Sequence, residues 1–183
     1  MTTQIAEAAQ CELLAAWEPV SKRTAIMQAR PRTMILASVN PPRTLGLWEK
    51  ELLIAAGATG LANSEAHDIS AEELVAFAPE IIIIAGDNLE GLTELEGWLT
   101  LPAVTGHEVY LVEPAYLSEV GEGLAEAARV LATILHPSRF TEMLPTFSVQ
   151  LAPMSLFTGE SEEEDEADEE ESTNDAGQDD SHG

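Results

Sequence analysis

Short apolar runs alternate with amphipathic segments along the first three quarters of the chain. The runs at residues 33–39, 80–85 and 106–112 are rich in apolar and β-branched residues and predict buried strands. Between and around these runs, Leu, Ala and Glu recur at helical spacing. Helices are therefore expected at residues 6–17, 46–56, 70–78, 89–98 and 118–135.

Residues that cap or break helices mark the ends of several of these elements. Ser70 and Glu73 have the spacing of a capping box, and Pro79 closes the helix that they begin. Gly57 lies where a left-handed C-terminal cap belongs. The first helix is expected to stop before Pro19, because proline removes a helical hydrogen bond.

The alternation of strands and helices predicts an α/β fold, a three-layer lobe in which helices cover both faces of a mostly parallel sheet. A helix precedes this lobe. An acidic segment without apolar groups follows it, and we expect that segment to be disordered. The predicted divisions are 1–30 for the N-terminal helix and connector, 31–137 for the α/β lobe, 138–158 for a C-terminal arm and 159–183 for the acidic tail.

The charge of the chain is strongly negative and argues against nucleic acid as a partner. There are 33 acidic and 8 basic residues, for a formal net charge of -25. Such a field repels phosphates and anionic membrane surfaces. Four of the eight basic residues fall within residues 21–32. The longest unbroken apolar stretch, at residues 81–85, is far too short to span a membrane.

The loops that follow the predicted strands are the candidate binding site, because ligands of open α/β sheets sit at the carboxyl ends of strands. Trp48 follows the first loop and offers a flat apolar surface, whereas Trp98 is expected in the core. Ordinary turn chemistry accounts for the same Pro, Gly, Asn and Asp residues equally well. The candidate ligand-binding residues are Asn40, Pro41, Pro42, Trp48, Gly86, Asp87, Tyr116 and Glu119.

No pattern indicates an enzyme, a cofactor or a metal site. The serines have no nucleophile-elbow context, and the chain has no phosphate-binding glycine loop after a strand. His67, His107 and His136 are isolated from one another, and Cys11 is the single cysteine. Catalytic and metal-ligating residues are therefore predicted to be absent.

The order of these segments resembles the C-terminal lobe of helical-backbone periplasmic substrate-binding proteins. These proteins deliver cobalamin and ferric siderophores to ABC importers. The resemblance covers residues 31–137, and the Asn-Pro-Pro loop at Asn40 favours the cobalamin-like branch. The segments that carry it are PRTMILASVNPP at 31–42, GLW at 46–48, ELLIAAG at 51–57, ISAEEL at 69–74, APEIIIIAG at 78–86, Trp98, LPAV at 101–104, VYLV at 109–112 and the closing helix to LHP at 135–137.

The resemblance implies a corrinoid or ferric-siderophore ligand, and an ABC permease or a separate N-terminal lobe as partner. Glu119 or Glu122 would dock on arginines of the permease. Members of the family often have a basic Arg-Pro-Gly-Pro-Arg stretch at the position where residues 118–123 read SEVGEG. Acidic residues replace basic ones here, which argues against binding of an anionic group at this loop. The resemblance implies a periplasmic or extracellular location. Residues 1–10 lack the pattern of a secretory signal and favour the cytoplasm.

Two other readings remain open from the sequence. The lobe is alternatively a scaffold for protein–protein contacts outside transport, with the acidic tail serving solubility or partner binding. A degenerate fragment without function is the third reading.

Overall fold

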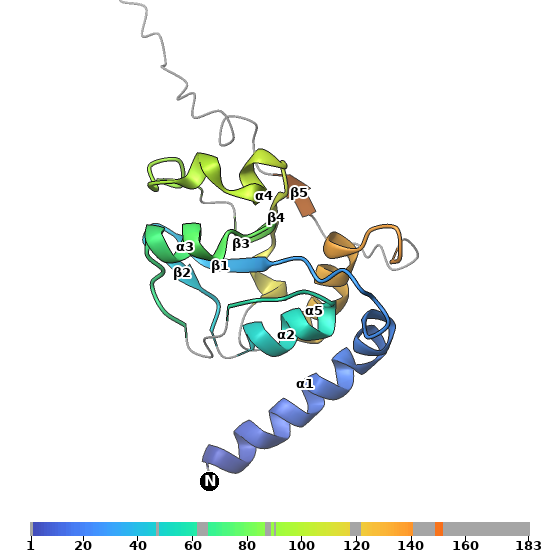
Figure 1. The fold of residues 1–183 in the computed structure, drawn as a ribbon. Coiled ribbons are helices and arrows are strands. Elements are labelled where there is room, and N and C mark those ends of the chain that lie inside the picture. Colours follow the sequence, from blue (N-terminus) through green and yellow to red (C-terminus); the bar gives the residue numbers. More distant parts are fainter. Residues whose placement is uncertain are drawn as a thin grey trace, which may run out of the picture.

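A computed structural model describes residues 2–46, 48–61, 66–86, 89, 91–117, 122–140 and 149–151; for 2–10, 122 and 149–151 it describes the backbone alone. Helices and strands alternate through the body, and α1 extends along one side (Figure 1). The elements are α1 (Thr2–Thr24), β1 (Thr33–Val39), β2 (Pro42–Thr44), α2 (Glu49–Ala56), α3 (Ala71–Phe77), β3 (Ile81–Ala85), η1 (Trp98–Thr100), α4 (Pro102–Thr105), β4 (Val109–Val112), η2 (Pro114–Tyr116), α5 (Glu122–Leu135) and β5 (Val149–Leu151).

One sheet with the strand order β2-β1-β3-β4-β5 forms the centre of the fold. The three predicted strands β1, β3 and β4 pair in parallel, and β2 and β5 add an antiparallel strand at each edge. Ile83 of β3 lies opposite Ile35 of β1 and Tyr110 of β4. The predicted α/β class with a mostly parallel sheet is confirmed.

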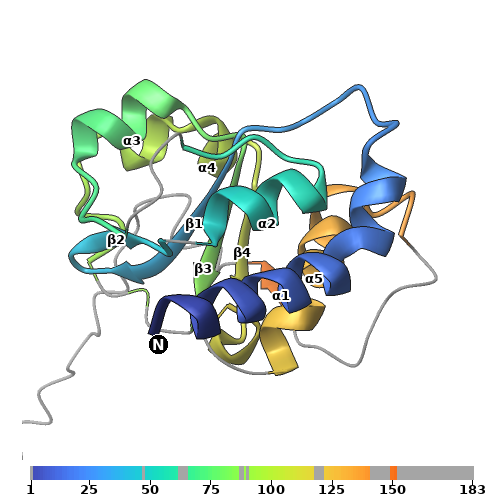
Figure 2. The ribbon, with the colours of Figure 1, turned by 90° about the horizontal axis from the view of Figure 1, so that it is seen from below.

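Alternate residues of the strands point into two apolar clusters, one on each face of the sheet. Ile35 and Ile83 face the cluster that α1, α2 and α5 complete. Leu36 and Ile84 face the opposite cluster, under α3, η1 and α4. Figure 2 shows the two groups of helices on either side of the strands. Because both faces are covered, a continuous apolar run such as residues 81–84 suits β3.

The predicted helix caps are present, and the 3-10 segment η1 buries its tryptophan. The Ser70 hydroxyl accepts from the Glu73 amide, and the Glu73 carboxylate accepts from the Ser70 amide, which completes the capping box. Gly57 has φ of 86° and ends α2 in the left-handed conformation. Trp98 is fully buried, as predicted.

The helix α1 runs through Pro19 to Thr24, so the prediction that it stops before Pro19 is wrong. Burial on α2 and α5 explains the continuation. Trp17 and Val20 are buried on either side of the proline, and the Trp17 indole donates to the Leu124 carbonyl at 2.8 Å. One turn later, the Thr24 hydroxyl donates to the Ala55 carbonyl at 2.8 Å. These contacts offset the hydrogen bond that proline cannot make.

The prediction of a helix at residues 89–98 is also wrong for the residues of this range that the structure describes. Turns occupy the described residues from 91 to 97, and η1 and α4 follow. Gly91 and Gly97 have φ of 80° and 79°, which interrupts the right-handed helical path. Leu92 and Trp98 are nevertheless buried, so the apolar residues reach the core without a helix.

The edge strands β2 and β5 were not predicted. Pro42 begins β2 at the edge of the sheet, where a missing amide donor is tolerated. In the predicted arm, Phe140 is buried and β5 pairs with β4, so these parts pack on the body. The predicted tail at 159–183 lies outside the described residues, and the divisions drawn between domains remain predictions.

Candidate functional site

The parallel strands bring three predicted loops to one edge of the sheet. The strands β1, β3 and β4 are neighbours and end at Val39, Ala85 and Val112, so the loops after them follow one another along this edge. We call it the carboxyl edge. Asp87 and Glu119 were also predicted here and lie outside the described residues.

The first loop is a tight connection between β1 and β2. The peptide bond from Asn40 to Pro41 is cis, and the Ser38 hydroxyl donates to the Pro41 carbonyl at 2.5 Å. Asn40 and Pro41 are exposed, and Pro42 is half-buried. A short, rigid hairpin therefore presents the Asn40 amide and an apolar proline ring at the carboxyl edge.

Two close approaches connect the three loops. A Cβ atom at Gly91 would lie 2.8 Å from Asn40 Nδ2, so the Asn40 side chain contacts the loop after β3. A Cβ atom at Gly86 would lie 3.8 Å from Pro114 Cγ, which places Gly86 beside the loop after β4. The Gly86 amide also donates to the Val112 carbonyl at 2.9 Å. The segment after β3 is thus approached by Asn40 at Gly91 and by Pro114 of the β4 loop at Gly86.

The two aromatic residues predicted for the site are both half-buried. Trp48 and Tyr116 pack against the apolar cluster between the sheet and α1, α2 and α5. Trp48 immediately precedes α2, and Tyr116 ends η2, which follows β4. Each ring therefore packs partly in the core and keeps part of its surface exposed.

The charged groups that the structure describes near the carboxyl edge include an ion pair and Glu113, an exposed residue at the start of the loop after β4. Arg43 in β2 contacts Asp68 at 2.9 Å, and both side chains are about half exposed. Among the described residues, no three His, Cys, Asp or Glu side chains gather where they would hold a metal ion. The carboxyl edge consists mainly of backbone, amide and apolar groups, which suits reversible binding of a partly apolar molecule.

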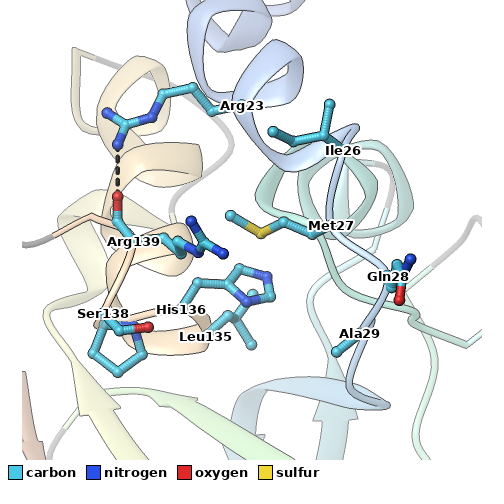
Figure 3. A pocket seen from close by; sticks show the side chains of 10 residues that line it. Arg23, Ile26, Met27, Gln28, Ala29, Leu135, His136, Ser138 and Arg139 are labelled. Atoms are coloured by element: carbon cyan, nitrogen blue, oxygen red, sulfur yellow. Dashed lines mark hydrogen bonds between the residues drawn. The ribbon is translucent and has the colours of Figure 1, made fainter.

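A cavity lies at the opposite, amino edge of the sheet and was not predicted. It has a volume of about 760 Å³ and opens between the end of α1, the connector after it and the end of α5 (Figure 3). Arg23, Met27, His136 and Arg139 are among its lining residues. The concentration of basic residues at 21–32 was the one sequence signal for it. Arg139 comes from a distant part of the chain, so only the fold reveals the cavity.

Comparison with family models finds no match, and comparison with curated proteins finds none either. Solved structures do match the fold. The chain is similar to the TroA-like periplasmic binding protein FepB from Veillonella parvula, with 20% identity over 74% of this chain and 48% of that one and a TM-score of 0.56. It is also similar to the molybdate periplasmic binding protein MolA from Haemophilus influenzae, with 24% identity over 71% and 43% and a TM-score of 0.59.

A third match is the periplasmic vitamin B12 binding protein BtuF of Vibrio cholerae, with 16% identity over 74% of this chain and 55% of that one and a TM-score of 0.54. The chain spans about half the length of these structures. The predicted fold, which is similar to that of one lobe of periplasmic binding proteins, is therefore confirmed. These neighbours are binding proteins described as periplasmic, and they lend no support to the cytoplasmic expectation. No described helix is long and apolar enough to cross a membrane.

Proposed function

We propose that this chain is a ligand-binding lobe of a substrate-binding protein that serves an ABC importer. In this proposal the carboxyl edge binds a corrinoid or ferric siderophore and does not transform it. Two close approaches, of Asn40 to Gly91 and of Pro114 to Gly86, carry the proposal because each links the segment after β3 to a neighbouring loop. The fold shared with binding proteins for several solutes supports the same role.

The residues at the carboxyl edge have distinct roles in this proposal. Trp48 and Tyr116 offer flat apolar contact, and the Asn40 amide supplies a hydrogen-bond donor and an acceptor. The rigid Pro41 and Pro42 limit the entropy lost on binding. Gly86 lets the ligand approach the backbone closely. Asp87 and Glu119 would add polar contacts.

The proposed partners are a membrane permease and an opposing lobe, and the proposed compartment is the periplasm or the cell exterior. A single lobe encloses only half of a ligand that sits between two lobes, so the affinity of this chain alone is expected to be weak. An opposing lobe would bury the remaining ligand surface and tighten binding.

Titration with cyanocobalamin and with a ferric siderophore tests the proposal. Saturable quenching of the fluorescence of Trp17, Trp48 and Trp98 would report binding, because energy transfer to a coloured ligand acts on buried and half-buried rings alike. Calorimetry should give the same affinity, because it does not depend on light absorbed by the ligand. Absence of a saturable signal by both methods up to high micromolar ligand would overturn the proposal.

Two variants and a control locate the binding surface. Asn40→Ala should weaken binding roughly three- to tenfold through the loss of its hydrogen bonds. Trp48→Phe should reduce the quenching while calorimetry still detects the ligand. Ile54 lies near the C-terminal end of α2, the helix that Trp48 precedes, and its side chain is 49% exposed. Ile54→Ala should therefore leave the quenching and the calorimetric signal unchanged. Equal affinities for Asn40→Ala and the parent chain would place the ligand elsewhere.

A further inference from the structure

The cavity at the amino edge combines an apolar wall with cationic groups. Met27 from the connector after α1 and Leu135 at the end of α5 form apolar parts of its lining. Ile26 also lines it and is 85% exposed, although it is a large apolar side chain. An apolar residue that open to solvent beside a cavity of about 760 Å³ is suited to contact with a bound organic molecule.

Arg23 is held in a fixed position at this cavity. Its guanidinium donates to the Arg139 carbonyl at 2.6 Å (Figure 3). The same group lies 4.4 Å from the centre of the buried Phe140 ring. Both contacts tie the end of α1 to the segment after α5. A cation held in this way loses little further freedom when an anion binds near it.

His136 and Arg139 supply further polar groups from the segment that follows α5. His136 Nε2 lies 3.2 Å from the Gly57 carbonyl, which can only accept, so this ring nitrogen carries the hydrogen. The contact fixes the ring at the cavity. The Arg139 side chain is exposed, and its guanidinium forms no ion pair with any carboxylate that the structure describes.

The local charge of the cavity is opposite to that of the chain. The whole chain has about four acidic residues for each basic one, yet the described residues that line the cavity include two arginines, a histidine and no acid. A ligand with a single negative group would meet attraction there and repulsion at most of the remaining surface.

We propose that this cavity is a second ligand site, separate from the carboxyl edge, for a small organic anion. The carboxylate, phosphate or sulfonate of the ligand binds Arg139 and Arg23, and its apolar part lies on Met27, Ile26 and Leu135. Guanidinium groups match such oxyanions in geometry and charge. The apolar wall favours a ligand with an aromatic or aliphatic body over a bare inorganic ion.

Anilinonaphthalene sulfonate is a suitable probe, because it joins one sulfonate to an apolar ring system and fluoresces on binding. Titration of the full chain should show saturable binding, and neutral phenylnaphthylamine should bind at least several-fold more weakly. Arg139→Gln should weaken sulfonate binding roughly three- to tenfold, the effect of losing one charge-assisted contact at an exposed position. Lys50→Gln removes the same charge at an exposed position of α2 and should leave the affinity unchanged.

Methionine methyl resonances give the position of the probe. With carbon-13 in the methionine methyl groups, the Met27 signal, assigned through Met27→Leu, should shift on titration. The Met34 signal should not, because Met34 is fully buried in the cluster on the other face of the sheet. Equal affinity of Arg139→Gln and Lys50→Gln, equal binding of the neutral probe, or an unmoved Met27 signal would each overturn the proposal.

Discussion

Glu49 is a buried acid whose carboxylate accepts hydrogen bonds at the point where β2 stops pairing with β1. Its side chain is 6% exposed, and its carboxylate accepts from the Leu45 amide at 3.0 Å and from the Ile35 amide at 3.4 Å. The β1–β2 pairing begins at Leu36, so Glu49 replaces a strand partner for Ile35. This residue fixes the start of α2, and with it the position of Trp48.

Replacing Glu49 with alanine should destabilise the protein. The Glu49→Ala change leaves the buried Ile35 amide and the half-buried Leu45 amide without their acceptor, which should lower the free energy of unfolding by about 1–3 kcal/mol. Urea unfolding followed by circular dichroism measures the difference. Lys50→Ala, an exposed change at the next position, should stay within about 0.5 kcal/mol of the parent chain. Equal losses for the two variants would contradict the role given to the Glu49 carboxylate.

The Glu49 carboxyl should also make stability depend on pH. Burial raises the pKa of Glu49 above its ordinary value, against the opposing effect of the amides of Ile35 and Leu45. Between the ordinary and the raised pKa, the folded protein binds a proton that the unfolded chain releases. Stability from this group is therefore fully present below the ordinary pKa and is lost as pH rises through the raised pKa.

Glu49→Gln, which cannot titrate, tests this dependence. The stability of the parent chain relative to Glu49→Gln should fall as pH rises from about 4 toward neutrality. Urea midpoints at several pH values provide the measurement, and Glu72→Gln, an exposed change on α3, controls for the loss of one charge. A difference between parent and Glu49→Gln that stays constant over this pH range would refute the assignment.

The helix α1 carries a proline that the fold tolerates rather than requires. Pro19 is exposed, while Trp17 and Val20 beside it are buried on the body. Pro19→Ala restores an amide donor inside a helix and should therefore raise the free energy of unfolding, by about 1–3 kcal/mol. Thermal unfolding measures the gain. A loss of stability would show that the helix needs the proline or that it ends there.

The local sequence pattern correctly predicted elements that are buried along their whole length. It failed where contacts between distant parts of the chain determine the bounds of an element. The isoleucine run in β3 is buried on both faces, so its composition alone specified a central strand. The hydrogen bonds of the Ser70 capping box form within three residues, so the sequence predicted this cap equally well. By contrast, α1 passes Pro19 because of burial against α2 and α5, and the turns at 91–97 depend on two glycines with positive φ. Neither effect has a periodic signature.

The same distinction applies to the two sites. The carboxyl edge follows from the order of strands and helices, because parallel strands end together and their loops must meet. That Asn40 contacts Gly91 required the folded chain, since 51 positions separate them. The cavity at the amino edge is even harder to predict from the sequence. Its two arginines, Arg23 and Arg139, become neighbours only when α1 packs along α5.

The two proposed sites lie at opposite edges of one sheet, and this arrangement makes their energetics separable. Substitutions well apart and without shared partners usually act additively. Asn40→Ala should therefore leave the affinity for anilinonaphthalene sulfonate unchanged, and Arg139→Gln should leave corrinoid or siderophore binding unchanged. The double variant should show both losses, each equal to that of its single variant. If saturation with the sulfonate instead changes the affinity for the corrinoid, the sheet couples its two edges and the sites are not independent.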